Sequence, residues 1–262
     1  MKVRKAFYRL GFILISALVL AFPLLCAAPE GSVARRDIVS YCVGDATGDG
    51  SPELLAIAGR AGKTDTGRIC GSCLLVCAAS AAGDMESLGY IPPEKIRDFV
   101  DLSGISPLKV QIGDVNGDGI NEVAICVYKT AKFHPVMAMR PFFFDLVEGC
   151  LIPVWLGSRL SRPFDDYILY DIDKDGIDEI ISAEQLENGG RVLAVYNWEG
   201  FGFEMLTQSE AFDGEIRFDP VGRADETGGI SAVYIKGMEQ TGIVFRLKDN
   251  RLIHSETSVT GG

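Results

Sequence analysis

The sequence predicts an all-β fold, namely a small β-propeller of about four four-stranded blades or an open propeller arc. Three observations lead to this prediction. An acidic turn motif occurs three times along the 262 residues, short apolar runs typical of strands flank each copy, and a further pair of such runs follows each copy. The copies start about 50 to 70 residues apart. Four-stranded units at this period, none of which can bury both faces alone, are typical of propellers.

The repeated motif carries an oxygen-bearing side chain at positions 1, 3 and 5, a glycine at position 6 and a glutamate at position 9. Its copies are residues 45–53, 114–122 and 171–179. Alternate side chains of a tight loop point inward, and a hard cation such as Ca²⁺ takes six to eight oxygen ligands at about 2.3–2.6 Å. The glycine supplies the positive φ that a sharp turn around an ion requires. The motif therefore predicts three calcium loops.

Two other interpretations of the motif are weaker. An EF-hand needs an acidic side chain at position 12 and a helix on either side. Position 12 holds Ala56, Ile125 and Ser182, and the flanking runs have the β-branched and aromatic composition of strands. Asp-Gly turns also form hairpins without metal. Three copies in register, each ending in glutamate at the same offset, favour metal binding over this alternative.

Outer pairs of apolar runs complete the predicted units. In each unit one strand precedes the acidic loop, one follows it, and two more form an outer hairpin. Between the first and second units, a helical turn is expected within residues 92–107. The predicted outer hairpins join residues 73–77 to 88–91, 142–147 to 151–155, 192–196 to 203–206, and 243–247 to 252–254.

The fourth unit lacks a complete acidic loop. Its first strands are expected at residues 216–218 and 230–235, on either side of a long connection that starts at Asp219. Positions 3 and 5 of this connection are Val221 and Arg223, which cannot ligate calcium. Two roles for Arg223 are open: its guanidinium replaces the ion by pairing with neighbouring carboxylates, or it is a solvated side chain in a lengthened loop.

The N-terminal segment has the order of a secretory signal, with basic residues, an apolar run over residues 10–25 and small residues at 26–28. The apolar run approaches the length of a membrane span, so an uncleaved anchor is the alternative. We expect residues 1–28 to be a signal peptide or N-terminal membrane anchor, residues 29–36 a short linker and residues 37–262 the propeller domain. Either interpretation places the domain outside the cytoplasm, in a periplasm, secreted or at the cell surface.

Charge and composition argue against several classes of function. The chain has 36 acidic and 25 basic residues, a net charge of −11 and no long basic run. Nucleic acid is therefore not an expected partner, and a membrane is expected only through the N-terminal anchor. His134 and His254 lie far apart and fit no metal-ligand spacing. Six cysteines follow residue 28, and we expect them to be structural disulfides or buried thiols rather than catalytic groups.

The acidic loops resemble the FG-GAP, or VCBS-type, repeats of integrin α-subunit propellers and of many bacterial secreted proteins. Residues 114–122 match best, and the repeat pattern extends over residues 37–257. The resemblance implies up to three Ca²⁺ ions, each bound in the hairpin between the first two strands of a blade. The implied ligands are Asp45, Thr47, Asp49 and Glu53 in the first loop, Asp114, Asn116, Asp118 and Glu122 in the second, and Asp171, Asp173, Asp175 and Glu179 in the third.

The chain departs from integrin-like propellers in size. Those propellers have seven blades, and this sequence has material for about four. It is therefore expected either to close a small ring or to form an arc that needs a partner.

The expected function is that of a non-catalytic, calcium-stabilised binding or scaffold module for a protein or a glycan. Calcium sites of extracellular modules need affinities of only about 10⁻⁴ to 10⁻³ M. The alternative is an extracytoplasmic enzyme of polysaccharide-lyase or hydrolase type, with Asp165, Asp166 or Asp213 as acid and base. Nothing in the spacing of these aspartates singles out a pair, so we predict no catalytic residue.

Aromatic residues and one connecting segment are further candidates for contacts with a ligand. A lectin is disfavoured because tryptophan occurs in only two units, as Trp155 and Trp198, and we expect these rings to belong to the core. Residues 157–166 connect the second and third units and include Arg159 and Arg162. A specific contact, if the protein makes one outside the loops, is expected in this segment, but a solvated linker is the favoured interpretation.

Overall fold

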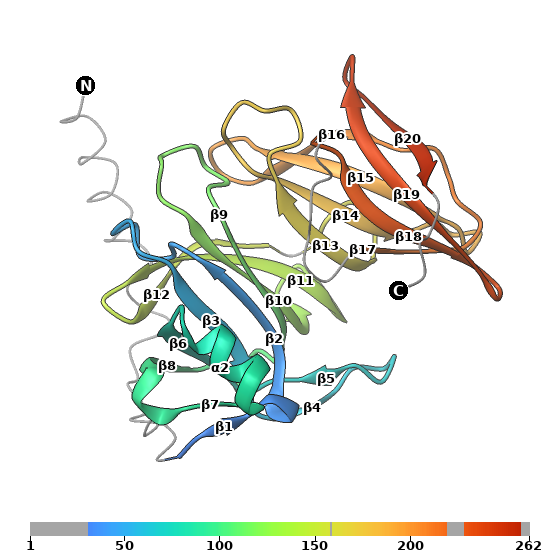
Figure 1. Ribbon diagram of the computed structural model, residues 1–262. Helices are drawn as coiled ribbons and strands as arrows, with labels where there is room; N and C mark the ends of the chain where they lie inside the picture. Colours follow the sequence, from blue (N-terminus) through green and yellow to red (C-terminus); the bar gives the residue numbers. More distant parts are fainter. Residues whose placement is uncertain (1–30, 158, 219–227, 258–262) are drawn as a thin grey trace, which may run out of the picture.

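A computed structural model describes residues 31–157, 159–218 and 228–257 of the chain (Figure 1). The predicted signal or anchor at residues 1–28, and Val221 and Arg223 of the fourth loop, lie outside the described residues. The fold is all-β, as predicted, and consists mainly of four four-stranded antiparallel sheets. None of the helices among the described residues is long and apolar enough to cross a membrane.

The four sheets, which we number 1 to 4, follow one another along the chain. In each of them the strands pair in chain order, and the acidic loops join the first strand of sheets 1, 2 and 3 to the second. Sheet 1 contains β2 Ile38–Gly44, β3 Glu53–Ala58, β6 Cys73–Ala78 and β8 Ile96–Asp101; sheet 2 contains β9 Pro107–Gly113, β10 Glu122–Ala131, β11 His134–Val147 and β12 Cys150–Leu156. Sheet 3 contains β13 Phe164–Tyr170, β14 Glu179–Gln185, β15 Arg191–Trp198 and β16 Phe203–Gln208; sheet 4 contains β17 Glu215–Phe218, β18 Ile230–Lys236, β19 Glu239–Lys248 and β20 Arg251–Thr257.

The predicted outer hairpin of the first unit is wrong. The segment after β6 forms helix α2, Ala81–Leu88, which ends at Gly89 with a φ of 76°. Its alanines favour a helix, and the left-handed conformation at the end is one that glycine adopts without strain. The next residues, β7 Tyr90–Ile91, pair with β1 Val33–Ala34.

The fourth strand of sheet 1 is β8, which pairs with β6. The helical turn expected between the first two units is therefore limited to the 3₁₀ helix η2, Pro93–Lys95. A second insertion, the β4–β5 hairpin, lies between β3 and β6 and contains β4 Gly62–Lys63 and β5 Ile69–Cys70. A 3₁₀ helix η1, Arg35–Asp37, precedes β2.

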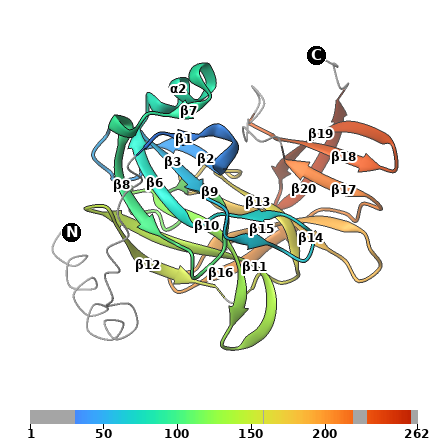
Figure 2. The same ribbon diagram turned by 90° about the horizontal axis from the view of Figure 1, so that it is seen from below.

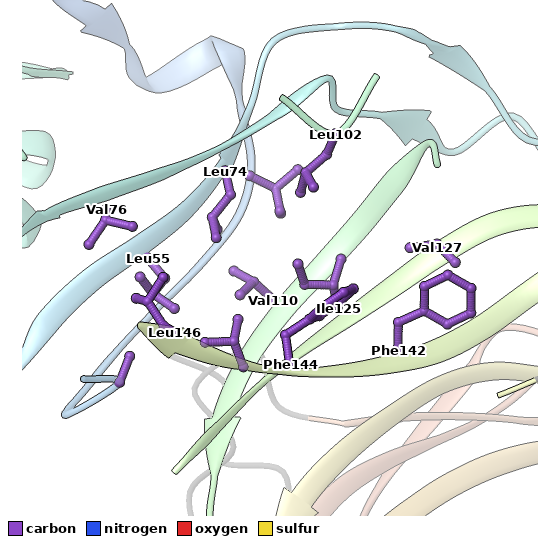
Figure 3. Packing of buried hydrophobic residues seen from close by; sticks show 13 residues of the cluster. Leu55, Leu74, Val76, Leu102, Val110, Ile125, Val127, Phe142, Phe144 and Leu146 are labelled. Carbon is purple, nitrogen blue, oxygen red and sulfur yellow. The ribbon is translucent and has the colours of Figure 1, made fainter. Parts of the chain in front are cut away.

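Neighbouring sheets bury their apolar faces against each other. The first strands lie next to one another in the order β2, β9, β13 and β17. Each fully buried aliphatic or aromatic side chain contributes about 1.5–3 kcal/mol through the water it no longer contacts. Between sheets 1 and 2 the core includes Leu55, Leu74, Val76, Val110, Ile125 and Phe144 (Figure 3). Sheets 2 and 3 share Ala124, Phe143, Tyr167 and Ala194, and sheets 3 and 4 share Ile181, Leu193, Ile216 and Phe245.

The two ends of this stack differ in polarity. The outer face of sheet 1 is apolar and is covered by α2, whose Ala81 and Met85 pack against it together with Ile91. On sheet 4, alternate residues such as Arg217, Ser231 and Arg246 point away from the core, which leaves that face largely polar. Polar outer faces are typical of terminal units in repeat proteins. Among the described residues no core cluster joins sheet 4 to sheet 1, so the four sheets form an open series (Figure 1).

The six cysteines after residue 28 are free thiols. Of the two outcomes predicted, the structure therefore contains thiols rather than disulfides. Burial raises the pKa of Cys42, Cys77 and Cys126 to about 12, since a thiolate is poorly solvated there. Cys70 and Cys73 are also buried, whereas Cys150 is exposed.

Candidate functional site

Each acidic loop is closed by hydrogen bonds from its backbone to the carboxylate at position 1. In the second loop, Asp114 Oδ1 accepts from the Gly117 amide at 2.7 Å and Oδ2 accepts from the Gly119 amide at 2.8 Å. The corresponding distances from Gly48 and Gly50 to Asp45 are 2.8 and 2.9 Å. Gly119 has a φ of 83°, as the sharp turn requires. In the third loop, Asp171 accepts from the Asp175 and Gly176 amides at 3.1 and 3.0 Å.

The glutamate at position 9 begins the second strand of its sheet and is buried. Glu53 and Glu122 are 1% exposed, and Glu179 is 3% exposed. In all three loops one carboxylate oxygen accepts a hydrogen bond from the backbone amide at position 2. The distances are 3.1 Å from Ala46, 3.0 Å from Val115 and 3.0 Å from Ile172.

Two of these glutamates occupy an electrostatically unfavourable place. Burial, followed by the charges of neighbouring aspartates, raises the pKa of Glu122 and of Glu179 from 4.5 to about 8. The hydrogen bonds from the Val115 and Ile172 amides lower these pKa values, but by less than burial raises them. A carboxylate in such a place needs a proton or a cation. Among the ion pairs of the described residues, none joins Glu122 or Glu179 to a lysine or an arginine.

The third loop gathers its carboxylates most closely. Asp171, Asp173 and Glu179 each offer an oxygen, and these oxygens lie within 4.8 Å of one another. Burial, followed by the charges of its neighbours, raises the pKa of Asp173. In the second loop the residue at position 3 is Asn116, whose Nδ2 contacts Glu122 Oε1. The Oδ1 atom of Asn116 accepts a hydrogen bond from the Asp118 amide at 3.0 Å, which sets this orientation of the side-chain amide.

The first loop differs because it has a cation of its own. The guanidinium of Arg97 on β8 lies 3.4 Å from Glu53 Oε1. At position 3 the first loop has Thr47, which offers a hydroxyl where the third loop offers a carboxylate. All three loops therefore join the first two strands of a sheet, as predicted, but among the described residues only the glutamates of the second and third loops lack a compensating positive charge.

The three loops lie side by side, and the contacts between them involve position 8, which the sequence analysis did not single out. Asn121 donates from Nδ2 to the Asp45 carbonyl at 2.8 Å, and the Asp178 amide donates to the Asp114 carbonyl at 2.8 Å. Burial raises the pKa of Asp178 as well. In the sequence, these contacts could have been suspected from the polar residue that directly precedes the glutamate in two of the loops, Asn121 and Asp178.

A cleft of about 920 Å³ lies at the ends of the strands that are opposite the acidic loops. Its walls come from the β4–β5 hairpin and from β11, β13, β15 and β17. Acidic loops join first strands to second strands, so connections between second and third strands emerge at the other end. Figure 2 shows the β4–β5 hairpin reaching across toward sheet 3, and Arg68 of this hairpin donates from Nη1 to the Asp165 carbonyl at 2.7 Å.

The aspartates considered as acid or base are held in ion pairs. Asp165 pairs with Arg191 and accepts from Gln185 Nε2 at 2.7 Å. Asp166 lies 2.7 Å from Lys109 Nζ. Asp213 lies 2.7 Å from Lys236 Nζ, and hydrogen bonds from Lys236 and Tyr234 lower its pKa. Each of the three carboxylates therefore has a cationic partner.

The connector at residues 157–166 is partly packed rather than wholly solvated. Arg162 pairs with the buried Glu184 at 3.1 Å, and Phe164 is buried in the core between sheets 2 and 3. The prediction that the tryptophan rings belong to the core is confirmed for Trp155, which packs against the core between sheets 2 and 3, whereas the half-buried Trp198 is not part of that core and contacts Phe203 at its margin. The Trp155 and Trp198 rings lie 5.1 and 5.2 Å from the Phe203 ring, centroid to centroid.

No protein-family model matches the chain, and no curated protein matches its sequence.

Proposed function

We propose that this chain is a non-catalytic, calcium-stabilised binding or scaffold module, an open propeller of FG-GAP type that works outside the cytoplasm. One observation carries the proposal. Glu122 and Glu179 are buried among loop aspartates, and no cation of the described protein compensates them. A bound ion in the second and third loops would remove this electrostatic cost.

The donor atoms fit calcium better than a transition metal. The loops offer carboxylate, amide and backbone oxygens and contain no histidine or cysteine. Hard cations take oxygen ligands, whereas zinc and copper sites use imidazole or thiolate. Asp171, Asp173, Asp175 and Glu179 would hold the ion in the third loop, and Asp114, Asn116, Asp118 and Glu122 would hold it in the second. In the first loop, Arg97 competes with an ion for Glu53.

The surroundings of the reactive side chains support a binding role. Buried cysteines keep raised pKa values and are poor nucleophiles. His134 Nδ1 accepts from the buried Arg140 at 3.0 Å, and His254 pairs with Glu210 at 3.2 Å. Sheets stacked on apolar cores form a rigid frame, and loops and clefts on such frames are the usual places for recognition.

Thermal unfolding of the purified protein, followed by calorimetry in excess calcium and after chelation, tests the proposal. We expect calcium to raise the midpoint by several degrees, because a ligand at 100 times its Kd adds about 2.7 kcal/mol per site. Magnesium at the same concentration is the control and should have a smaller effect. An unchanged midpoint after chelation contradicts the proposal.

A further inference from the structure

We infer that the calcium sites of the second and third acidic loops are coupled, so that an ion bound in one loop strengthens binding in the other. This inference rests on the proposed calcium binding and specifies how its two sites act together. Two kinds of observation lead to it: a contact that recurs between neighbouring loops, and the distribution along the chain of the residue types that make this contact.

Each loop after the first packs against the loop before it. Ile177, at position 7 of the third loop, lies over Gly117, at position 4 of the second, and a Cβ atom at Gly117 would be only 2.7 Å from Ile177 Cδ1. The second loop repeats this contact on the first, where a Cβ atom at Gly48 would be 3.2 Å from Ile120 Cγ2. A larger residue at position 4 would displace the isoleucine, so this close approach requires glycine.

A hydrogen bond at position 8 accompanies each of these contacts. The Asp178 amide donates to the Asp114 carbonyl, and Asn121 Nδ2 donates to the Asp45 carbonyl, both at 2.8 Å. We refer to the contact and the hydrogen bond together as the loop junction. Each junction therefore joins positions 7 and 8 of one loop to positions 4 and 1 of the loop before it.

The residue types at these positions follow the order of the loops. Position 4 is glycine in the first and second loops, each of which has a loop after it, but it is Lys174 in the third, the last complete copy. Positions 7 and 8 are isoleucine followed by asparagine or aspartate in the second and third loops, but serine followed by proline, which has no amide hydrogen, in the first. The backbone alone does not require glycine at position 4, because Lys174 has a φ of 66°, close to the 71° of Gly117. The glycines and isoleucines therefore serve the junction rather than the individual loop.

The junction between the second and third loops connects ligands of the two proposed sites. Asp178 directly precedes Glu179, and its amide holds the carbonyl of Asp114, the first ligand of the second loop. Its carboxylate lies beside the chain that enters that loop, since a Cβ atom at Gly113 would be 2.5 Å from Asp178 Oδ2. Burial raises the pKa of Asp178, and hydrogen bonds from the Asp114 and Asp171 amides to its carboxylate oppose the shift. The carboxylate therefore joins the backbone at the first ligand of both loops.

The junction gives the coupling a positive sign. An ion that fixes the third loop also fixes residues 177 and 178, and these residues hold the first ligand of the second loop in place. The second loop then loses less freedom when it binds its own ion. Repulsion between the two cations acts in the opposite direction, and the negative charge of Asp178, which lies between the loops, offsets part of it.

Calcium titrations followed by proton–nitrogen NMR spectra of the purified protein test this inference, because the Gly119 and Gly176 amides report the second and third loops separately. We expect the Kd of the second loop to be at least about fivefold higher in Glu179→Gln, in which the third loop is silenced, than in the unaltered protein. Glu122→Gln should raise the Kd of the third loop by a similar factor, since coupling is reciprocal.

Charge alone predicts the opposite result for Glu179→Gln. The third loop with its ion carries four carboxylates and two positive charges, a net charge of −2, whereas the silenced loop keeps three carboxylates, a net charge of −3. The more negative neighbour would attract an ion to the second loop more strongly. The direction of the change therefore separates coupling through the junction from simple electrostatics.

Substitutions at position 4 test the junction itself. Gly117→Asn should abolish the coupling, because its Cβ displaces Ile177 while asparagine tolerates the left-handed backbone. Lys174→Asn is the matched control, since it places the same residue at the same position of a loop that no complete loop follows, and it should leave the coupling unchanged. Ile177→Ala, which shortens the seated side chain instead, should also weaken the coupling and replaces Gly117→Asn if that variant does not fold. Each variant is compared with its own Glu179→Gln form, so that changes in the affinity of a single loop cancel.

The outcomes separate this inference from the proposed function. An equal or lower Kd of the second loop in Glu179→Gln overturns the inference, as does coupling that persists in Gly117→Asn or in Ile177→Ala, and these results leave the proposed calcium binding intact. If excess calcium moves neither glycine signal, the proposed function is contradicted and the inference with it.

Discussion

The buried glutamates make the stability of the metal-free protein fall as the pH rises. Glu122 and Glu179 have a pKa of about 8 in the folded chain and 4.5 as the unperturbed value. A raised folded-state pKa means that the folded protein binds the proton more tightly than the unfolded chain. The resulting stabilisation is fully present below pH 4.5 and is lost as the pH rises through about 8.

The size of the effect follows from the two pKa values. One pKa unit corresponds to 1.36 kcal/mol, so each glutamate costs about 2.5 kcal/mol of stability between pH 5 and pH 7. Two such glutamates cost about 5 kcal/mol, a large share of the 5–15 kcal/mol that typically stabilises a domain. Calcium should remove this loss, because the ion stabilises the ionised carboxylates.

Urea unfolding of the metal-free protein between pH 5 and pH 8 measures the effect. The double variant Glu122→Gln/Glu179→Gln replaces both carboxylates with neutral amides of similar shape. We expect it to exceed the unaltered metal-free protein in unfolding free energy at pH 8 and to gain nothing from calcium. The difference between the two proteins cancels the titration of the histidines and of other carboxylates.

Glu53→Gln is the matched control, because Glu53 is equally buried but pairs with Arg97. It should lower stability at pH 8 rather than raise it. The reasoning is refuted if the metal-free protein is as stable at pH 8 as at pH 5, or if the double variant is the less stable protein at pH 8.

Three further predictions concern the first loop, the core and the thiols. Arg97→Met should lower the stability of the metal-free protein by about 2 kcal/mol, since it leaves the buried Glu53 without a cationic partner, and titration calorimetry should then detect calcium binding at the first loop; unchanged stoichiometry contradicts the role given to Arg97. Phe143→Ala should cost about 3–5 kcal/mol in urea unfolding, because this ring is fully buried and lies 4.9 Å from Phe203, whereas the exposed Phe201→Ala should change stability little. Among the six cysteines from Cys42 to Cys150, only Cys150 should react quickly with iodoacetamide in the folded protein; disulfide-linked peptides in a non-reducing digest would rule this out.

Local sequence patterns predicted the strands around the acidic loops because the loop chemistry itself sets the boundaries. The first aspartate follows the end of one strand, and the glutamate at position 9 is followed by the next, so the strand expected from residue 123 begins only one residue earlier, at Glu122. The period-2 and β-branched runs then predicted the outer strands of sheets 2, 3 and 4. In sheet 1 the same approach failed, because α2 and β7 occupy the place of the expected strand and β8 follows only after them.

Contacts between distant residues escaped the sequence analysis. Arg97 reaches Glu53 from 44 residues away, and Arg68 reaches Asp165 from 97 residues away. The periodicity of side chains within one strand does not predict such pairs, because they depend on how the sheets stack. The difference between the first loop and the other two was therefore visible only in the structure.

Calcium titration by calorimetry into the metal-free protein tests the central claim most directly. We expect two ions to bind with the unaltered protein and none with Glu122→Gln/Glu179→Gln. The absence of binding to the unaltered protein, or equal binding to both proteins, would contradict the claim that the second and third loops are calcium sites closed by buried glutamates.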